Sequence, residues 1–195
     1  MRPWDPVVPA ESSLNEVFSL LIMVVLNIVA LNVFGLRKSG KQAGLIHWIR
    51  SLPSSPEIVC LQEMHCISSE EAQAWFAASR FSVAVSPGSV RSCGCVLLFR
   101  PPLVLSSVSM DQEGRFLVCS SELADSVFCV VALYAPNCNP ARNLFLNYVP
   151  TQVDSVTPKL LCGDFNTAFD RSLDRLGSDP LDGSRESFAS LLRLF

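Results

Sequence analysis

The chain has 195 residues, which is enough for one domain with a sizeable core and a little short for two. Charged residues make up 17% of it and apolar residues 49%, so much of the sequence is typical of a protein interior. The net charge of -3 argues against a generally basic nucleic-acid-binding protein, although it leaves room for a local basic patch.

The first element is an uncharged run from Val17 to Leu36, about as long as a helix that spans a bilayer. Asn27 and Asn32 lie inside the run, and amide side chains are costly in lipid. We therefore favour a buried strand over residues 24–34 and expect no membrane contact. A single-pass membrane protein is the alternative.

Helices and strands alternate after this run. Apolar residues recur at helical spacing over residues 41–52, and the apolar segment 57–63 predicts a strand that ends in polar residues. A second helix is expected over residues 68–79, because Ser68 and Glu71 have the spacing of a capping box. These segments predict a mixed α/β domain.

The middle of the chain changes to strands and turns. Five apolar segments in a row predict an antiparallel meander, at residues 81–86, 94–99, 103–108, 115–120 and 127–134. Asn139 as N-cap and Pro140 at the first helical position then begin a helix that runs to about residue 149. A strand over residues 159–165 and a helix over residues 185–195 complete the chain.

The cysteines favour a reducing environment. Four of the eight lie in apolar runs and are expected to be free core thiols; these are Cys60, Cys119, Cys129 and Cys162. Cys93 and Cys95 form the closest pair and should point to opposite faces of a strand. There is no Asn-x-Ser/Thr sequon. We expect an intracellular protein, nuclear or cytoplasmic, that is not secreted.

Polar residues stand at or near the C-terminal ends of the apolar strands. In layered α/β folds such residues reach one edge of a sheet, where ligands bind, so they predict a convergent site. Ordinary polar residues at turns are the alternative. The residues are Asn32, Gln62, Glu63, Tyr134, Asn137, Asp164 and Asn166.

Five segments carry a resemblance to a known family. They are LNVFGLR at 31–37, IVCLQEMH at 58–65, DQEGRFL at 111–117, LYAPN at 133–137 and LLCGDFNTAFD at 160–170. In order and approximate spacing they resemble the endonuclease/exonuclease/phosphatase superfamily, and within it the apurinic-type endonuclease domain of LINE (non-LTR) retrotransposons. The resemblance implies a four-layer α/β sandwich, with two mostly antiparallel sheets face to face and helices outside. It also implies a leader at residues 1–22 and a partial domain over residues 23–195.

The resemblance implies phosphodiester cleavage of DNA with Mg²⁺ or Mn²⁺ and no obligate protein partner. Glu63 matches the metal-binding glutamate of the family, and Asn32 the asparagine beside the metal. Asp164 matches the aspartate that orients or deprotonates the attacking water, and Asn166 the amide near water and phosphate. Tyr134 matches the tyrosine that donates to the scissile phosphate, with support from the Asn137 amide.

The chain departs from the family pattern in two places. Phe34 stands where the family often has Asp or Asn. The further Asp and the Ser-Asp-His triplet that end family members have no match, which predicts a C-terminally truncated domain with impaired activity. Of the two histidines, we expect His47 to lie partly exposed on a helix. His65 follows the LQE motif and is the less favoured candidate for a general base.

Basic residues give a weaker indication. Arg37 and Lys38, with Lys41, follow the Asn32 strand and are candidates for contact with the DNA backbone, although a solvated loop explains them equally well. Arg115 is expected to pair with Asp111 or Glu113. Two alternatives to a DNA nuclease stay open, namely a phosphatase of the same superfamily and a non-catalytic remnant.

Overall fold

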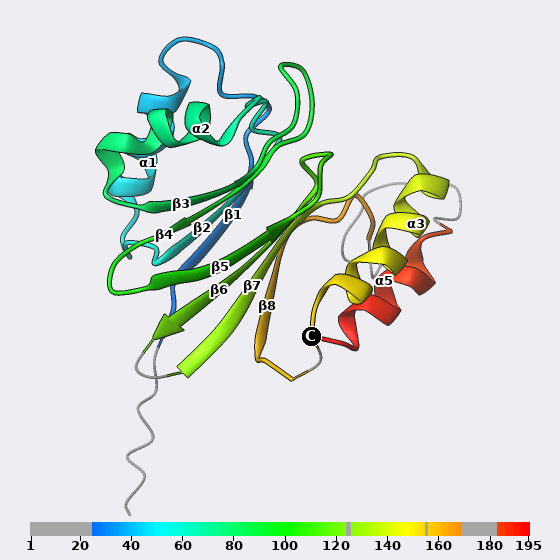
Figure 1. The fold of residues 1–195 in the computed structure, drawn as a ribbon. Helices are drawn as coiled ribbons and strands as arrows, with labels where there is room; N and C mark the ends of the chain where they lie inside the picture. The colour runs from blue at the N-terminus through cyan, green and yellow to red at the C-terminus, as the bar shows by residue number, and fades with distance from the viewer. Residues whose placement is uncertain (1–24, 124–125, 155, 169–182) are drawn as a thin grey trace, which may run out of the picture.

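Two four-stranded sheets pack face to face, with helices on their outer faces (Figure 1). The computed structural model describes residues 25–123, 126–154, 156–168 and 183–195. The predicted leader at residues 1–22 lies outside them. The expected α/β sandwich of two mostly antiparallel sheets is confirmed.

The first sheet has the strand order β1-β2-β4-β3. Its strands are β1 (Ile28–Asn32), β2 (Ile58–Gln62), β3 (Ser82–Ser86) and β4 (Cys95–Phe99). The edge strand β1 runs parallel to β2, with Asn32 opposite Gln62, and the other neighbours are antiparallel. The C-terminal ends of β1 and β2 therefore lie side by side at one edge.

The second sheet has the order β5-β6-β7-β8. Its strands are β5 (Val104–Met110), β6 (Phe116–Leu123), β7 (Ser126–Tyr134) and β8 (Lys159–Asp164). Here the edge strand β8 runs parallel to β7, with Asp164 opposite Tyr134. Each sheet thus has one parallel pair at an edge, and β1 and β8 contact one another.

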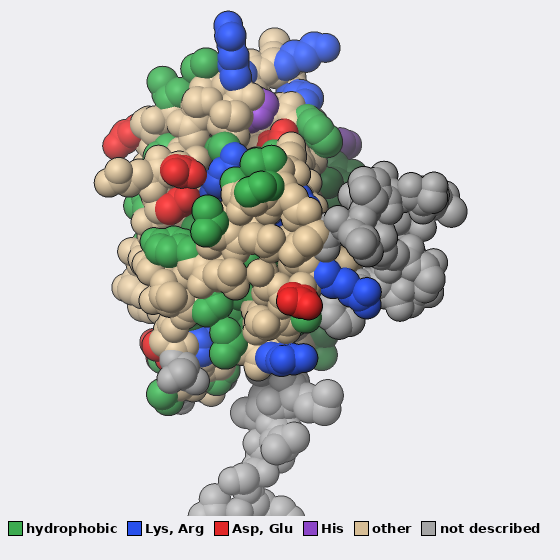
Figure 2. Space-filling model, turned by 90° about the vertical axis from the view of Figure 1, so that its right-hand side faces the viewer, with side chains coloured by type: hydrophobic (Ala, Val, Ile, Leu, Met, Phe, Trp, Pro, Cys, Tyr) green, Lys and Arg blue, Asp and Glu red, His purple; other side chains and the backbone are tan. Residues whose placement is uncertain are grey.

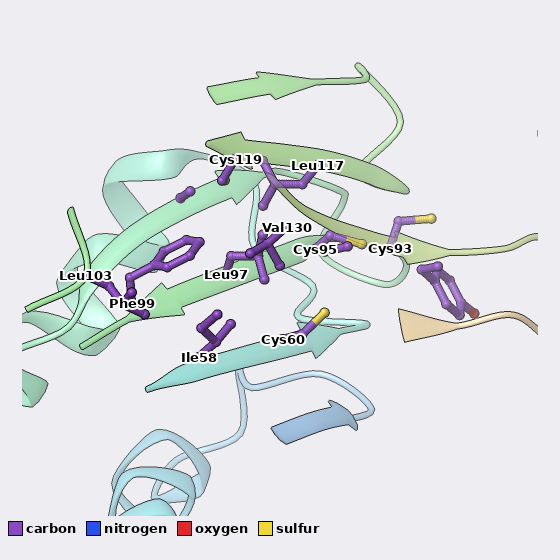
Figure 3. Packing of buried hydrophobic residues seen from close by; sticks show 13 residues of the cluster. Ile58, Cys60, Cys93, Cys95, Leu97, Phe99, Leu103, Leu117, Cys119 and Val130 are labelled. Carbon is purple, nitrogen blue, oxygen red and sulfur yellow. The ribbon is translucent and has the colours of Figure 1, made fainter. Parts of the chain in front are cut away.

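Alternating side chains of the strands build three layers of core. In β2, Ile58 and Cys60 face the other sheet, whereas Val59 and Leu61 face the helices α1 (Lys41–Ser51) and α2 (Ser69–Phe76). The inter-sheet layer also contains Leu97 of β4 and Val130 of β7 (Figure 3). The period of two thus explains why both faces of these strands are apolar.

The outer face of the second sheet is covered by α3 (Asn139–Tyr148) and α5 (Arg185–Leu192). Short 3-10 helices follow α2 and α3, namely η1 (Ala77–Ser79) and η2 (Val149–Gln152). The Ser68 side chain accepts a hydrogen bond from the Glu71 amide at 3.2 Å, which confirms the predicted cap of α2. For α3 the N-cap is Cys138, one residue before the predicted Asn139.

The predicted five-strand meander is wrong, because its strands divide between the sheets. β3 and β4 form a hairpin in the first sheet, and β5, β6 and β7 form a meander in the second. The chain crosses between the sheets at Pro101 and Pro102, where proline nitrogens cannot donate to a strand ladder.

The cysteines are free thiols, as predicted, and six of them are buried. The expectation that Cys93 and Cys95 point to opposite faces is wrong. Residues two apart in a strand point to the same face, and both side chains enter the inter-sheet core, with Cys93 just before β4 (Figure 3). Cys60 of β2 and Cys162 of β8 are neighbours between the sheets, and the interaction with Cys162, together with burial, raises the pKa of the Cys60 thiol.

The described part of the uncharged run, residues 25–36, contains the strand β1. β1 occupies Ile28–Asn32, within the predicted range 24–34, and pairs along its whole length with β2. The prediction that this strand is buried is wrong, because β1 is an edge strand and none of its residues is fully buried. Among the described residues, no helix has both the length and the apolar character needed to cross a membrane.

Candidate active site

The candidate site lies where the C-terminal ends of the two parallel strand pairs meet. A cavity of about 460 Å³ opens there, lined by residues of β1, β2, β8 and the loop after β8. The strand ends that line this cavity are the same ones from which the sequence predicted a convergent polar site. They include Asn32, Gln62, Asp164 and Asn166.

Asn32 joins the two sheets through two carboxylates. Its Nδ2 atom donates to Glu63 Oε1 at 2.9 Å and to Asp164 Oδ2 at 3.0 Å. Its Oδ1 atom accepts a hydrogen bond from the Phe34 amide at 3.1 Å. With the amide oriented in this way, Asn32 holds Glu63 and Asp164 together, and its own oxygen is turned toward the backbone.

Glu63 sits in a strained turn just after β2. Glu63 and His65 both have left-handed backbones, with φ of 54° and 58°. Non-glycine residues in this region cost about 1 to 3 kcal/mol each and persist only where neighbours hold them. Backbone hydrogen bonds hold this turn on both sides, from Gly35 N to Glu63 O at 2.7 Å and from His65 N to Cys93 O at 2.9 Å. The turn directs the Glu63 side chain toward Asn32.

Asp164 is fixed from the second sheet. Asn166, with φ of 50°, donates its backbone N–H to Asp164 Oδ1 at 3.0 Å, and its Nδ2 atom donates to Ala135 O at 2.7 Å. Ala135 N donates in turn to Asp164 O at 2.8 Å. The loops after β7 and β8 are therefore tied together behind the carboxylate.

Tyr134, the last residue of β7, is 6% exposed. Burial and a hydrogen bond from its hydroxyl to the Glu63 carboxylate raise the pKa of the phenol well above its ordinary value. The Arg115 guanidinium lies over the ring, 5.1 Å from its centroid, and opposes this shift in pKa. Tyr134 is thus a neutral phenol and a hydrogen-bond donor beside Glu63 at physiological pH.

His65 lies beside Glu63, a position that sequence reasoning gave little weight. Its Nε2 atom is 3.8 Å from Glu63 Oε2, and its ring packs against Gly35 so closely that a Cβ atom there would stand 2.5 Å from His65 Nδ1. The adjacency of His65 to LQE was the only sequence signal for this contact. His47, in contrast, is exposed on α1, as expected.

The predicted substrate-binding residues differ in whether their side chains are bonded within the protein or exposed. The Arg37 guanidinium pairs with Glu71 at 2.6 Å and donates to His65 O at 2.8 Å. Lys38 and Asn137 are exposed. The Lys41 ammonium donates to three backbone oxygens of residues 33–35. Arg115 forms an ion pair with Glu113, one of its two expected partners, at 3.8 Å.

A buried arginine on α3 was missed by the sequence analysis. Arg142 is 6% exposed, and it donates to Ser184 Oγ at 2.7 Å and to Asn137 O at 2.7 Å. Ser184 precedes α5, and its hydroxyl contacts Thr167 in the loop after β8 at 3.5 Å. Arg142 thus links the start of α5 to the loops that follow β7 and β8. An arginine within an amphipathic helix gives no sequence signal for such a role.

The oxygen atoms of this edge fit a hard divalent cation. Glu63 and Asp164 approach the same amide nitrogen, and in the described part of the chain neither forms an ion pair with a lysine or arginine. Two convergent carboxylates without a lysine or arginine partner favour a cation. The described residues contain no cluster of three or more His, Cys, Asp or Glu for a metal. Water or substrate oxygens would therefore complete the coordination.

Basic side chains are dispersed on one face of the molecule. On the face shown in Figure 2, Lys and Arg side chains lie in separate groups among apolar and acidic ones. This agrees with the net charge of -3.

Comparisons with known proteins agree with this fold. The model of the Endonuclease/Exonuclease/phosphatase family matches residues 29–188. An AP endonuclease from Archaeoglobus fulgidus is similar in structure, with a TM-score of 0.66 and 21% identity over 87% of this chain and 71% of that one. The AP endonuclease LMAP from Leishmania major has a TM-score of 0.60 and 19% identity, over 87% and 66%. TDP2 from D. rerio, complexed with a single-strand DNA product, has a TM-score of 0.58 and 16% identity, over 76% and 63%.

Proposed function

Because this chain belongs to the endonuclease/exonuclease/phosphatase family, we propose that it is a metal-dependent DNA endonuclease of the LINE retrotransposon type. Enzymes of this superfamily generally use divalent metals, and the proposed ion here is Mg²⁺ or Mn²⁺. The observation that carries the proposal is the double hydrogen bond of Asn32, which brings Glu63 of one sheet and Asp164 of the other to the same point.

Glu63 would hold the cation, with Asn32 beside it, and the Asn32 amide keeps the Glu63 carboxylate close to Asp164. A carboxylate oxygen is a donor of the kind that Mg²⁺ and Mn²⁺ prefer. When bound, such an ion neutralises the charge that grows on the phosphate during hydrolysis.

Protein side chains would act on the attacking water and on the phosphate. Asp164 is held by Asn166 N and Asn32 Nδ2, and as a fixed carboxylate it orients the attacking water and accepts a proton from it. The water oxygen forms a bond to phosphorus, and the bond from phosphorus to the leaving strand oxygen breaks. Tyr134, neutral because its pKa is raised, would turn its single O–H from Glu63 to donate a hydrogen bond to a phosphoryl oxygen.

A plasmid-nicking assay tests this proposal. We expect the chain to convert supercoiled DNA to the nicked form with Mg²⁺, and Asp164→Asn to lower the rate by about a hundredfold or more, as expected for a lost general base. Glu122→Gln is the matched control, since Glu122 is exposed near the far end of β6 and makes no side-chain bond among the described residues. Equal nicking by the Asp164→Asn variant would refute the assignment.

A phosphatase of the same superfamily is the second candidate, because the same carboxylate pair suits a phosphomonoester. A substrate panel separates the two. Cleavage of intact plasmid or of a duplex with an abasic site supports the endonuclease. Release of phosphate from a monoester alone supports the phosphatase, and no Asp164-dependent turnover of either supports a non-catalytic remnant.

We expect slow cleavage by these 195 residues alone. The sequence contains no Ser-Asp-His triplet, and of its two histidines only His65 lies at the site. Adding a donor segment with the triplet should raise the rate. The retrotransposon type rests on the order of the five sequence segments. A reverse transcriptase encoded after Phe195 would support it.

A further inference from the structure

A second cavity lies on the outer face of the first sheet. Its volume is about 550 Å³, and it is enclosed by the end of α1, the segment η1, the start of β3 and the end of β4. Phe99 of β4 pairs with Ile58, the first residue of β2, so this cavity lies at the end of the sheet opposite the candidate active site. A strand of five residues separates the two ends by about 17 Å.

The lining of this cavity is partly apolar. Ile49, Phe76 and Leu98 lie beneath it and are fully buried, so the apolar surface that a ligand can reach belongs to Ile46, Phe81 and Pro101. The Arg100 guanidinium lies over the Phe81 ring at 4.9 Å from the centroid. The volume is within the range of small-molecule sites.

Three arginines form the rim, namely Arg50, Arg80 and Arg100. Arg50 donates to Ala78 O at 2.9 Å and Arg100 to Pro56 O at 2.9 Å, which leaves most of their N–H groups without a protein acceptor in the described residues. No carboxylate in the described part of the chain forms an ion pair with any of the three.

The carboxylate of Glu57 interacts electrostatically with Arg100, but it is turned toward Asn27. It accepts hydrogen bonds from Asn27 N at 2.7 Å and Asn27 Nδ2 at 3.1 Å. The first of these is the main reason why the pKa of Glu57 is lowered, and Arg100 contributes least. The cavity therefore concentrates three positive charges in a chain whose net charge is -3.

We propose that this cavity binds a nucleotide, through its phosphate at the arginine rim and its base against the stacked Phe81 and Arg100 side chains. Guanidinium groups match phosphate oxygens with two parallel hydrogen bonds, and aromatic rings and guanidinium planes stack on nucleobases. The nucleotide is either free or part of a single strand, and both present the same chemistry. The site is separate from the proposed catalytic edge, so its occupancy does not require Asp164.

Calorimetric titration of the 195-residue chain without divalent metal tests this proposal. The probes are thymidine 5'-monophosphate, a short oligothymidylate and inorganic phosphate. We expect the monophosphate to bind, and Arg50→Ala and Arg80→Ala each to weaken it about tenfold, the effect of losing one charged hydrogen bond. Phe81→Leu should weaken the nucleotide and leave phosphate unchanged. Tighter binding of the oligothymidylate than of the monophosphate, lost in the same variants, would assign the nucleotide to a single strand.

Arg91→Ala is the matched control, since Arg91 is an exposed arginine on another loop. Asp164→Asn should leave nucleotide binding intact, and the Arg50 and Arg80 variants should keep any nicking activity, so failure of this proposal and of the nuclease proposal are distinguishable. Unchanged binding by Arg50→Ala and Arg80→Ala would overturn the site. Equal affinity for inorganic phosphate, or for a glutamate-rich peptide, would overturn the nucleotide assignment.

Discussion

The two sides of the candidate active site position their polar residues in different ways. On the first-sheet side, Glu63 and His65 lie in a left-handed turn that is held by backbone hydrogen bonds and, in addition, by a charged side chain, the Arg37 guanidinium bonded to His65 O. On the second-sheet side, Asp164 is braced mainly by neighbouring backbone, through Ala135 and the amide of Asn166. Asn32 is the residue that joins them.

The parallel strand pairs account for only part of the placement of these polar side chains. Each pair ends at the same edge of its sheet, yet the carboxylates meet because the residues just beyond the strands leave the extended conformation. Phe34, Glu63 and Asn166, which follow β1, β2 and β8, all have positive φ. Backbone strain of this kind gathers at functional sites, where surrounding contacts hold it in place.

The largest expected effect comes from crowding the second-sheet side at Gly163. This glycine has φ of 147°, and a Cβ atom there would stand 2.0 Å from Leu133 O, a backbone atom that cannot yield without moving β7. We expect Gly163→Ala to lower the free energy of unfolding by about 3 kcal/mol or more, because overpacking and an unfavourable φ add together. Urea denaturation measures the change.

Gly44→Ala is the control for this substitution. Gly44 lies within α1, and a Cβ atom there would meet nothing within 4 Å. Since alanine favours helix over glycine, we expect a gain of about 0.5 to 1 kcal/mol. A Gly163→Ala variant as stable as the parent chain would show that the β7–β8 contact is looser than described.

A smaller effect is expected at the junction itself. Asn32→Asp places a third carboxylate against Glu63 and Asp164, so we expect a loss of about 1 to 2 kcal/mol without metal, from repulsion and a lost donor. Because a cation relieves this repulsion, added Mg²⁺ should raise the Tm of this variant more than that of the parent chain.

Asn27→Asp is the matched control for the metal effect. Asn27 also donates to a carboxylate, Glu57, but at the other end of β1 and with no second carboxylate bonded to it in the described residues. We expect added Mg²⁺ not to restore the stability that the Asn27→Asp variant loses. Equal recovery of both variants by Mg²⁺ would mean that the ion acts by general screening and not at the site.

The sequence predicted the strand ends well, because both the alternation of apolar residues and the family motifs bear on them. The motifs assign Asn32 and Asp164 to one site, and the two side chains are hydrogen-bonded in the structure. The division of the five strands between two sheets was missed, since local periodicity is the same in either sheet. The buried Arg142 was missed because its partners Asn137 and Ser184 are close only in the folded chain.

The left-handed residues were also beyond prediction from sequence. Glu63 and Phe34 have no special preference for positive φ as residue types, and only tertiary contacts keep them there. The same limit applies to Arg37. Its place after LNVFGL suggested contact with DNA, whereas the structure gives its guanidinium two protein partners, Glu71 and His65 O.

Arg37 therefore gives the smallest and most specific test of the first-sheet side. If Arg37 braces the turn, Arg37→Ala should lower stability by about 1 kcal/mol, as for a partly exposed ion pair and one hydrogen bond. It should also lower kcat for DNA nicking with little change in KM, since the Glu63 turn loosens. If Arg37 contacts DNA instead, KM rises and stability is unchanged. Lys38→Ala is the control, because Lys38 is exposed beside Arg37 and can act only through DNA. An Arg37→Ala variant that behaves like Lys38→Ala in both measurements would rule out the bracing role.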